Sequence, residues 1–92
     1  MHPSQAAGLE WDGGNQSEMS RHGVTPAEVE QVWINDPAYA SNKRGRSGDW
    51  RMIGRTDSGR ALTVILLTQA ATHTMRAITV YDAPRGDRTR YL

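Results

Sequence analysis

Cysteine and phenylalanine are absent from this chain of 92 residues, and its longest apolar run covers only residues 64–67. Without cysteine, disulfides and thiolate metal sites are excluded. The apolar run is far too short to span a membrane. Residues 1–8 lack the apolar segment of a secretory signal peptide, so we expect a cytoplasmic protein with no membrane contact.

A chain of this length forms one domain around one small core. Because phenylalanine is missing, aliphatic strands and the three tryptophans must supply most of that core. Little room remains for a deep enclosed pocket, so we expect the functional site to be an open surface. The three histidines are scattered, with no i, i+4 pair, and carry no zinc signature. We therefore expect no metal and no cofactor.

Positive charge is concentrated in the second half of the chain. Residues 1–42 contain one cation, Arg21, and six carboxylates, whereas residues 43–92 contain Lys43 and nine arginines with four carboxylates. A guanidinium group presents a planar fork that binds phosphate oxygens in pairs. The second half is therefore suited to a polyanion, with RNA the first candidate. A solvated charged surface accounts for the composition equally well.

The hydrophobic patterns predict an α+β fold over residues 8–92, after a disordered lead over residues 1–7. The expected order is β-α-α-β-β-β-α, an antiparallel sheet with two N-terminal helices on one face and a short C-terminal helix. The expected strands are residues 8–11, 49–56, 60–68 and 75–81, and the expected helices are residues 13–22, 26–34 and 85–91. Residues 38–48 are expected to form a mobile basic loop.

Three local patterns fix the details of this prediction. Thr25-Pro26-Ala27-Glu28 is a capping box with proline at the first helical position. The strand at residues 60–68 is apolar on both faces, which predicts that it is the central strand. Strict alternation along the last strand puts Ala77, Thr79 and Tyr81 on one face and Arg76, Ile78 and Val80 on the other.

The cations of the sheet and the last helix can converge where these two elements meet. RNA cleavage at a 2′-hydroxyl needs proton carriers and donors for the charged phosphorane. Tyr81 and His22 are convenient proton carriers, although His22, just before Gly23, also suits the capping of a helix end. The candidate catalytic residues are Arg55, Arg76, Tyr81, Arg85, Arg88 and His22. The candidate RNA-binding residues are Lys43, Arg44, Arg46, Arg51 and Arg90. The competing interpretation pairs each arginine with a nearby carboxylate.

Motifs from the start, middle and end of the chain carry a family resemblance. They are Glu10-Trp11-Asp12, Arg21-His22-Gly23-Val24-Thr25-Pro26, Gly54-Arg55-Thr56, Gly59-Arg60, Arg76-Ala77-Ile78-Thr79-Val80 and Arg85-Gly86-Asp87-Arg88-Thr89-Arg90-Tyr91. In this order and spacing they resemble the BrnT-type toxins of type II toxin–antitoxin systems. The resemblance extends over residues 8–92, which implies a single BrnT-like domain with a RelE-like fold.

The resemblance also implies a function and partners. It implies a metal-independent endoribonuclease, an mRNA interferase, that arrests growth by cleaving RNA. It implies a cognate ribbon-helix-helix antitoxin that neutralises the toxin in a heterotetrameric complex, so that DNA is bound only through the antitoxin. The chain departs from the family in three respects: Tyr81 replaces a usual arginine, Pro84 and Gly86 interrupt the last helix, and a lysine common in the first helix is absent. These departures leave an alternative hypothesis open, in which the chain is a catalytically weakened module that binds RNA or antitoxin without cleaving RNA.

A third hypothesis is a DNA-binding helix-turn-helix formed by the two N-terminal helices. The expected second helix, residues 26–34, carries Glu28 and Glu30 and no cation. An acidic recognition helix would be repelled by phosphate, so this hypothesis ranks below the other two.

Overall fold

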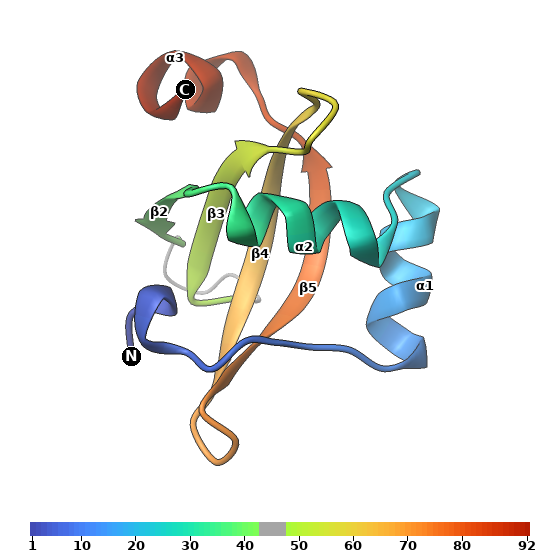
Figure 1. The fold of residues 1–92 in the computed structure, drawn as a ribbon, viewed down its shortest axis with the longest axis vertical. Coiled ribbons are helices and arrows are strands. Elements are labelled where there is room, and N and C mark those ends of the chain that lie inside the picture. The colour runs from blue at the N-terminus through green and yellow to red at the C-terminus, as the bar shows by residue number, and fades with distance from the viewer. Residues whose placement is uncertain (43–47) are drawn as a thin grey trace.

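A five-stranded sheet organises the fold, with its strands in the spatial order β1-β5-β4-β3-β2 (Figure 1). The computed structural model describes residues 1–42 and 48–92. The strands are β1 (Leu9–Glu10), β2 (Ala38–Ser41), β3 (Trp50–Arg55), β4 (Ala61–Gln69) and β5 (Thr74–Asp82). Neighbouring strands are antiparallel except β1 and β5, which are parallel. The α+β class is confirmed, with a sheet that is mixed and mostly antiparallel.

Helices accompany this sheet on both sides. They are the 3-10 helix η1 (Pro3–Gln5) and the α-helices α1 (Gly13–Arg21), α2 (Pro26–Ile34) and α3 (Arg85–Tyr91). In Figure 1, α2 crosses the sheet, α1 runs beside β5, and α3 lies beyond the end of β5. The predicted ends of α2 and α3 are confirmed. Within the described residues, no helix has both the length and the apolar character needed to cross a membrane.

Side chains at the N-termini fix where α1 and α2 begin. The Thr25 hydroxyl accepts a hydrogen bond from the Glu28 amide at 3.1 Å, and the Glu28 carboxylate accepts one from the Thr25 amide at 3.0 Å. Asp12 accepts hydrogen bonds from the first turn of α1, and the Asn15 side chain accepts one from the Asp12 amide. These reciprocal bonds satisfy donors that a helix start leaves unpaired. They offset the low helix propensity of the two glycines that open α1.

The main core lies between the sheet and the helices α1 and α2. Every one of its residues is at most 2% exposed. The helices and the turn between them contribute Met19, Val24, Val29 and Val32, and the strands contribute Met52, Leu62, Val64, Leu66, Met75, Ala77 and Val80. The prediction that β4 is the central strand is confirmed. Ile53 and Ile65 are also buried but belong to the opposite face of the sheet, outside this cluster.

Two N-terminal expectations differ from the structure because tertiary contacts order short segments. Residues 38–48 were expected to form a loop, but β2 pairs with β3, and its Tyr39 packs against the core. Residues 1–7 were expected to be disordered, but the His2 ring packs edge-on against Tyr39 and Trp50, at centroid distances of 5.3 and 4.9 Å. Pro3 in η1 is buried as a result.

A bulge changes which residues of β5 share a face. Thr79 pairs with Ile65, but Ala77 pairs with the next residue of β4, so Ile78 is the extra residue. The expectation of strict alternation was therefore wrong. Val80 joins Ala77 in the core, and Tyr81 lies on the opposite face.

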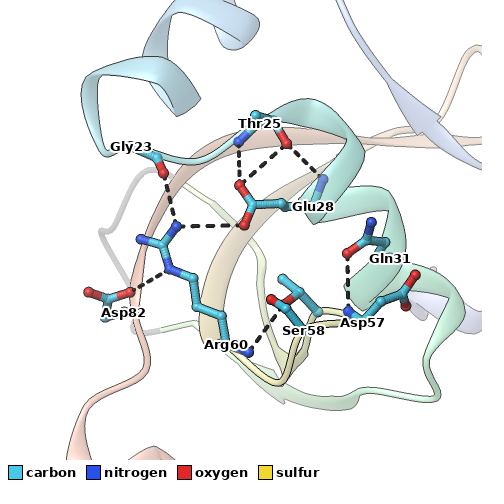
Figure 2. A network of polar contacts seen from close by, with 9 residues as sticks. Gly23, Thr25, Glu28, Gln31, Asp57, Ser58, Arg60 and Asp82 are labelled. Atoms are coloured by element: carbon cyan, nitrogen blue, oxygen red, sulfur yellow. Dashed lines mark hydrogen bonds and ion pairs between the residues drawn. The ribbon is translucent and has the colours of Figure 1, made fainter.

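Arg60 joins three parts of the fold at the turn between β3 and β4 (Figure 2). Its guanidinium donates hydrogen bonds to the Gly23 carbonyl at 2.9 Å and to the Asp82 carboxylate at 3.1 Å. The same group lies 3.7 Å from the carboxylate of Glu28 in the capping box of α2. The turn is therefore attached both to the α1–α2 connection and to the end of β5, directly before α3.

Gly54 allows β3 to approach the end of α2 closely. A Cβ atom at this position would lie 2.9 Å from Cγ1 of Val32 and 3.0 Å from Cβ of Pro37. We expect Gly54→Ala to lower the free energy of unfolding by about 1–3 kcal/mol, the usual cost of overpacking a core. Urea denaturation measures the change. Gly13→Ala is the matched control, because no atom lies within 4 Å of its added Cβ. Equal stability of the two variants would contradict this packing.

Candidate nucleic-acid interface

Arg51 connects β3 to α3 on the face of the sheet opposite the main core. Its guanidinium donates to the Asp87 carboxylate at 2.7 Å, and the other oxygen of Asp87 accepts a hydrogen bond from the Thr63 hydroxyl at 2.9 Å. The Thr63 side chain is buried, and that of Arg51 is 25% exposed. This charge-assisted bond is sheltered from solvent, so it holds α3 against the sheet more firmly than a surface ion pair would.

Tyr81 and Tyr91 lie beside the ion pair of Arg51 with Asp87. Tyr81 lies opposite Thr63 in the pairing of β4 with β5 and is 38% exposed. The Tyr91 ring centroid lies 5.9 Å from the guanidinium carbon of Arg51. The pKa of Arg51 is raised, chiefly by its hydrogen bond to Asp87 and also by the negative charge of that carboxylate. We call these five residues the α3 cluster, namely Arg51, Thr63, Tyr81, Asp87 and Tyr91.

Exposed arginines border the α3 cluster. Arg85, Arg88 and Arg90 are exposed on α3, and within the described residues none of them forms an ion pair with a carboxylate. The guanidinium of Arg90 lies 5.7 Å from the Tyr91 ring centroid. Arg55, at the exposed end of β3, donates to the Gly59 carbonyl at 3.0 Å. Within the part of the chain that the structure describes, no carboxylate neutralises Arg85, Arg88 or Arg90, so these three are available to an anionic ligand.

Arg76 is not part of this region. Its two terminal nitrogens donate to the two oxygens of Asp12 at 2.6 and 3.0 Å. Along β5 it is separated from Tyr81 by a distance on the order of 15 Å. The Asp12 pKa is lowered to about 2, chiefly by the hydrogen bond from Arg76. Arg76 therefore holds the N-terminus of α1 against β5, as the competing interpretation of the sequence expected for single arginines.

His22 lies at the end of α1 and contacts β5. Its Nε2 lies 2.9 Å from the Glu18 carboxylate and 3.3 Å from the Thr79 hydroxyl, which itself donates to Glu18 at 2.8 Å. The pKa of Glu18 is lowered, chiefly by the hydrogen bond from Thr79 and then by that from His22. The imidazole bonds Glu18 and Thr79, not the last carbonyls of α1. Thr79 precedes Tyr81 by two residues on the same face of β5.

The structure thus brings together some of the residues named from the sequence and adds others. Arg51, Tyr81, Arg85, Arg88 and Arg90 gather at α3, whereas Arg76 does not join them. Lys43, Arg44 and Arg46 lie outside the described residues. Sequence reasoning missed Thr63, Asp87 and Tyr91. Two signals could have identified them: Asp87 is the single carboxylate among the C-terminal arginines, and Thr63 is a polar residue within an apolar strand.

Two comparisons with known proteins identify no relative of this chain. A scan against protein-family models and a search of curated proteins both find no match to this chain. No group of three or more His, Asp or Glu side chains within residues 1–42 and 48–92 is placed to hold a metal ion. The fold is that of a small α+β domain, and the resemblance to BrnT-type toxins stays a prediction.

The Asp12–Arg76 pair predicts a specific acid sensitivity. The Asp12 pKa is held at about 2, below its usual 3.8, so the carboxylate contributes stability that is lost as the pH falls through that range. Asp12→Asn keeps a helix N-cap but removes the charge. We expect wild type to lose stability more steeply than Asp12→Asn between about pH 5 and pH 2 in urea denaturation. Parallel pH profiles would contradict the assignment.

Proposed function

We propose that this chain is a metal-independent endoribonuclease, the toxin of a type II toxin–antitoxin system, and that it binds RNA on the face formed by α3 and the α3 cluster. The observation that carries this proposal is the set of exposed arginines of α3, which have no carboxylate partner among the described residues. The small α+β fold is compatible with the RelE-like architecture that the family resemblance implies.

The distribution of charge in space supports RNA as the ligand. The six carboxylates of residues 1–42 lie on β1, α1 and α2 or at their ends. The one carboxylate of α3, Asp87, is already bonded to Arg51. A phosphate backbone approaching α3 therefore meets guanidinium groups, which bind phosphate oxygens in pairs. Tyr91, beside these groups, offers an aromatic ring on which a base can stack.

The residues around Tyr81 support a transesterification. In this reaction the 2′-oxygen loses its proton and attacks the neighbouring phosphorus, and the 5′-oxygen leaves and takes up a proton. The products are a 2′,3′-cyclic phosphate and a free 5′-hydroxyl. Tyr81 would donate the second proton, and His22, whose Nε2 lies 3.3 Å from the hydroxyl of Thr79 two residues away, is the candidate acceptor of the first. Arg85 and Arg88 would stabilise the charged phosphorane.

A second candidate function is RNA binding without cleavage. The observation that favours it is that two of the candidate arginines already form ion pairs within the protein. Arg51 is bonded to Asp87, and Arg76 is bonded to Asp12. The donors of these two guanidinium groups that bond Asp87 and Asp12 reach a phosphate only if the ion pairs open. In this case the chain would be a module that binds RNA or antitoxin, with α3 as its binding element.

The toxin proposal includes its partner and its location. A cognate ribbon-helix-helix antitoxin would cover the α3 face in a heterotetrameric complex in the cytoplasm, with DNA bound only through the antitoxin. Acidic side chains of such a partner would occupy the positions of RNA phosphates. Dissociation of that complex would then be faster at high salt than at low salt.

Binding is tested by Arg88→Ala. We expect weaker binding of single-stranded RNA, with the slope of log K against log salt reduced by about 0.7, because one phosphate contact is lost. Fluorescence anisotropy across a salt series measures both quantities. Arg21→Ala is the matched control, because Arg21 lies on α1 and is paired with Glu18 at 3.0 Å. Equal effects of the two substitutions would place the binding surface elsewhere.

Cleavage is tested by Tyr81→Phe in the presence of EDTA. We expect wild type to give discrete RNA products and Tyr81→Phe to retain RNA affinity while cleaving at least about 10²-fold more slowly, because a proton donor is removed. Gel analysis of an end-labelled RNA measures the rate, and anisotropy measures the affinity. Intact RNA with wild type at high protein concentration, together with salt-dependent binding, would refute cleavage and favour the non-cleaving module.

A further inference from the structure

A groove of about 330 Å³ lies between η1, the end of α2 and β2. These three elements meet at the edge of the sheet formed by β2, away from α1 (Figure 1). The groove is lined mainly by Pro3, Ala6, Trp33, Ile34, Pro37 and Tyr39. Ile34 is 75% exposed, the most among the large exposed hydrophobic residues of the described chain. The other apolar residues of the lining are buried or half-buried, so Ile34 is the apolar side chain that a ligand in the groove would cover.

The backbone of β2 offers hydrogen bonds along the same groove. The strand is the last in the sheet, and it pairs with β3 on one side only. No backbone hydrogen bond joins its outer edge to another segment of the described residues. Such an edge accepts an added strand, and the pocket beside it selects among the side chains of that strand.

The charge beside the groove is negative. Asp36 lines the groove, and within the described residues its carboxylate forms no ion pair. It follows the C-cap residue Asn35 of α2, whose last turn contains no basic residue, so the partial negative charge of the helix end is not compensated. Trp33 and Tyr39 present their rings in the same groove, with centroids 6.3 Å apart. A carboxylate beside aromatic rings is an environment that favours a guanidinium or ammonium group.

We propose that β2 and this groove dock an extended peptide segment of a partner protein. The segment adds a strand to the free edge of β2, places an apolar side chain against Ile34, and places an arginine or lysine beside Asp36. This inference is independent of the proposed RNA chemistry, because it uses neither α3 nor any residue of the α3 cluster.

The experiment is selection of short random peptides by phage display against the full chain. We expect the enriched peptides to alternate β-branched or aromatic residues and to contain an arginine or lysine. The best peptide is then synthesised together with a version in which glutamine replaces that cation. Its binding should shift the amide resonances of residues 33–41, and the glutamine version should bind roughly tenfold more weakly, because a charge-assisted contact is lost.

Two variants and a control locate the contacts. Asp36→Asn suits the positive φ of 53° at this position, so it removes the charge without new backbone strain, and it should abolish the preference for the cationic peptide. Ile34→Asp should weaken both peptides, whereas Leu92→Asp, at an apolar residue that is 46% exposed, should weaken neither. The proposal is overturned if no peptide is enriched or if the shifted resonances lie outside the groove. It is also overturned if Asp36→Asn leaves the preference for the cationic peptide unchanged. It is also overturned if sedimentation shows a dimer that Ile34→Asp dissociates, because a second copy would then occupy the edge.

Discussion

Burial of β4 on both faces is the constraint on which the rest of the structure depends. Leu62, Val64 and Leu66 face α1 and α2, while Thr63 and Ile65 face the other side and are also buried. A strand that is apolar on both faces must be covered twice. The first cover comes from the N-terminal half of the chain, which carries most of the carboxylates. The second includes α3, which carries the exposed Arg85, Arg88 and Arg90, whereas Arg60 and Arg76 lie beside carboxylates of the N-terminal half.

The arginines divide into two groups with different physical roles. Arg51, Arg60 and Arg76 each bond a carboxylate from a distant part of the sequence, and each joins two elements of the fold. Removing one partner of such a pair leaves the other without its hydrogen bonds, so these arginines belong to the framework. Arg85, Arg88 and Arg90 lie on a short helix with no carboxylate partner among the described residues. No ion pair of the described residues occupies them, and this is why the RNA-binding proposal rests on them.

Local signals made the helices and the central strand predictable, whereas contacts between distant residues were not predictable. The capping box of Thr25 and Glu28 acts within four residues, and α2 begins where the sequence placed it. β2 and η1 depend on aromatic packing between segments far apart in the chain. The hydrophobic periodicity within a segment does not predict such contacts. The bulge at Ile78 reversed the expected alternation. For the candidate site, the density of arginine near the C-terminus was visible in the sequence. The pairing of Asp12 with Arg76, across 64 residues, was not.

The parallel pairing of β1 with β5 has a consequence for biosynthesis. Leu9 lies opposite Met75, so the first strand of the sheet has no neighbour until β5 has been synthesised. Pairs so distant in sequence carry a large entropic cost of loop closure and tend to form late. During translation α1 and α2 can form early, but their apolar side chains stay exposed until the strands that bury them have formed. The nascent chain therefore exposes that side to chaperones until the strands of the sheet have been synthesised.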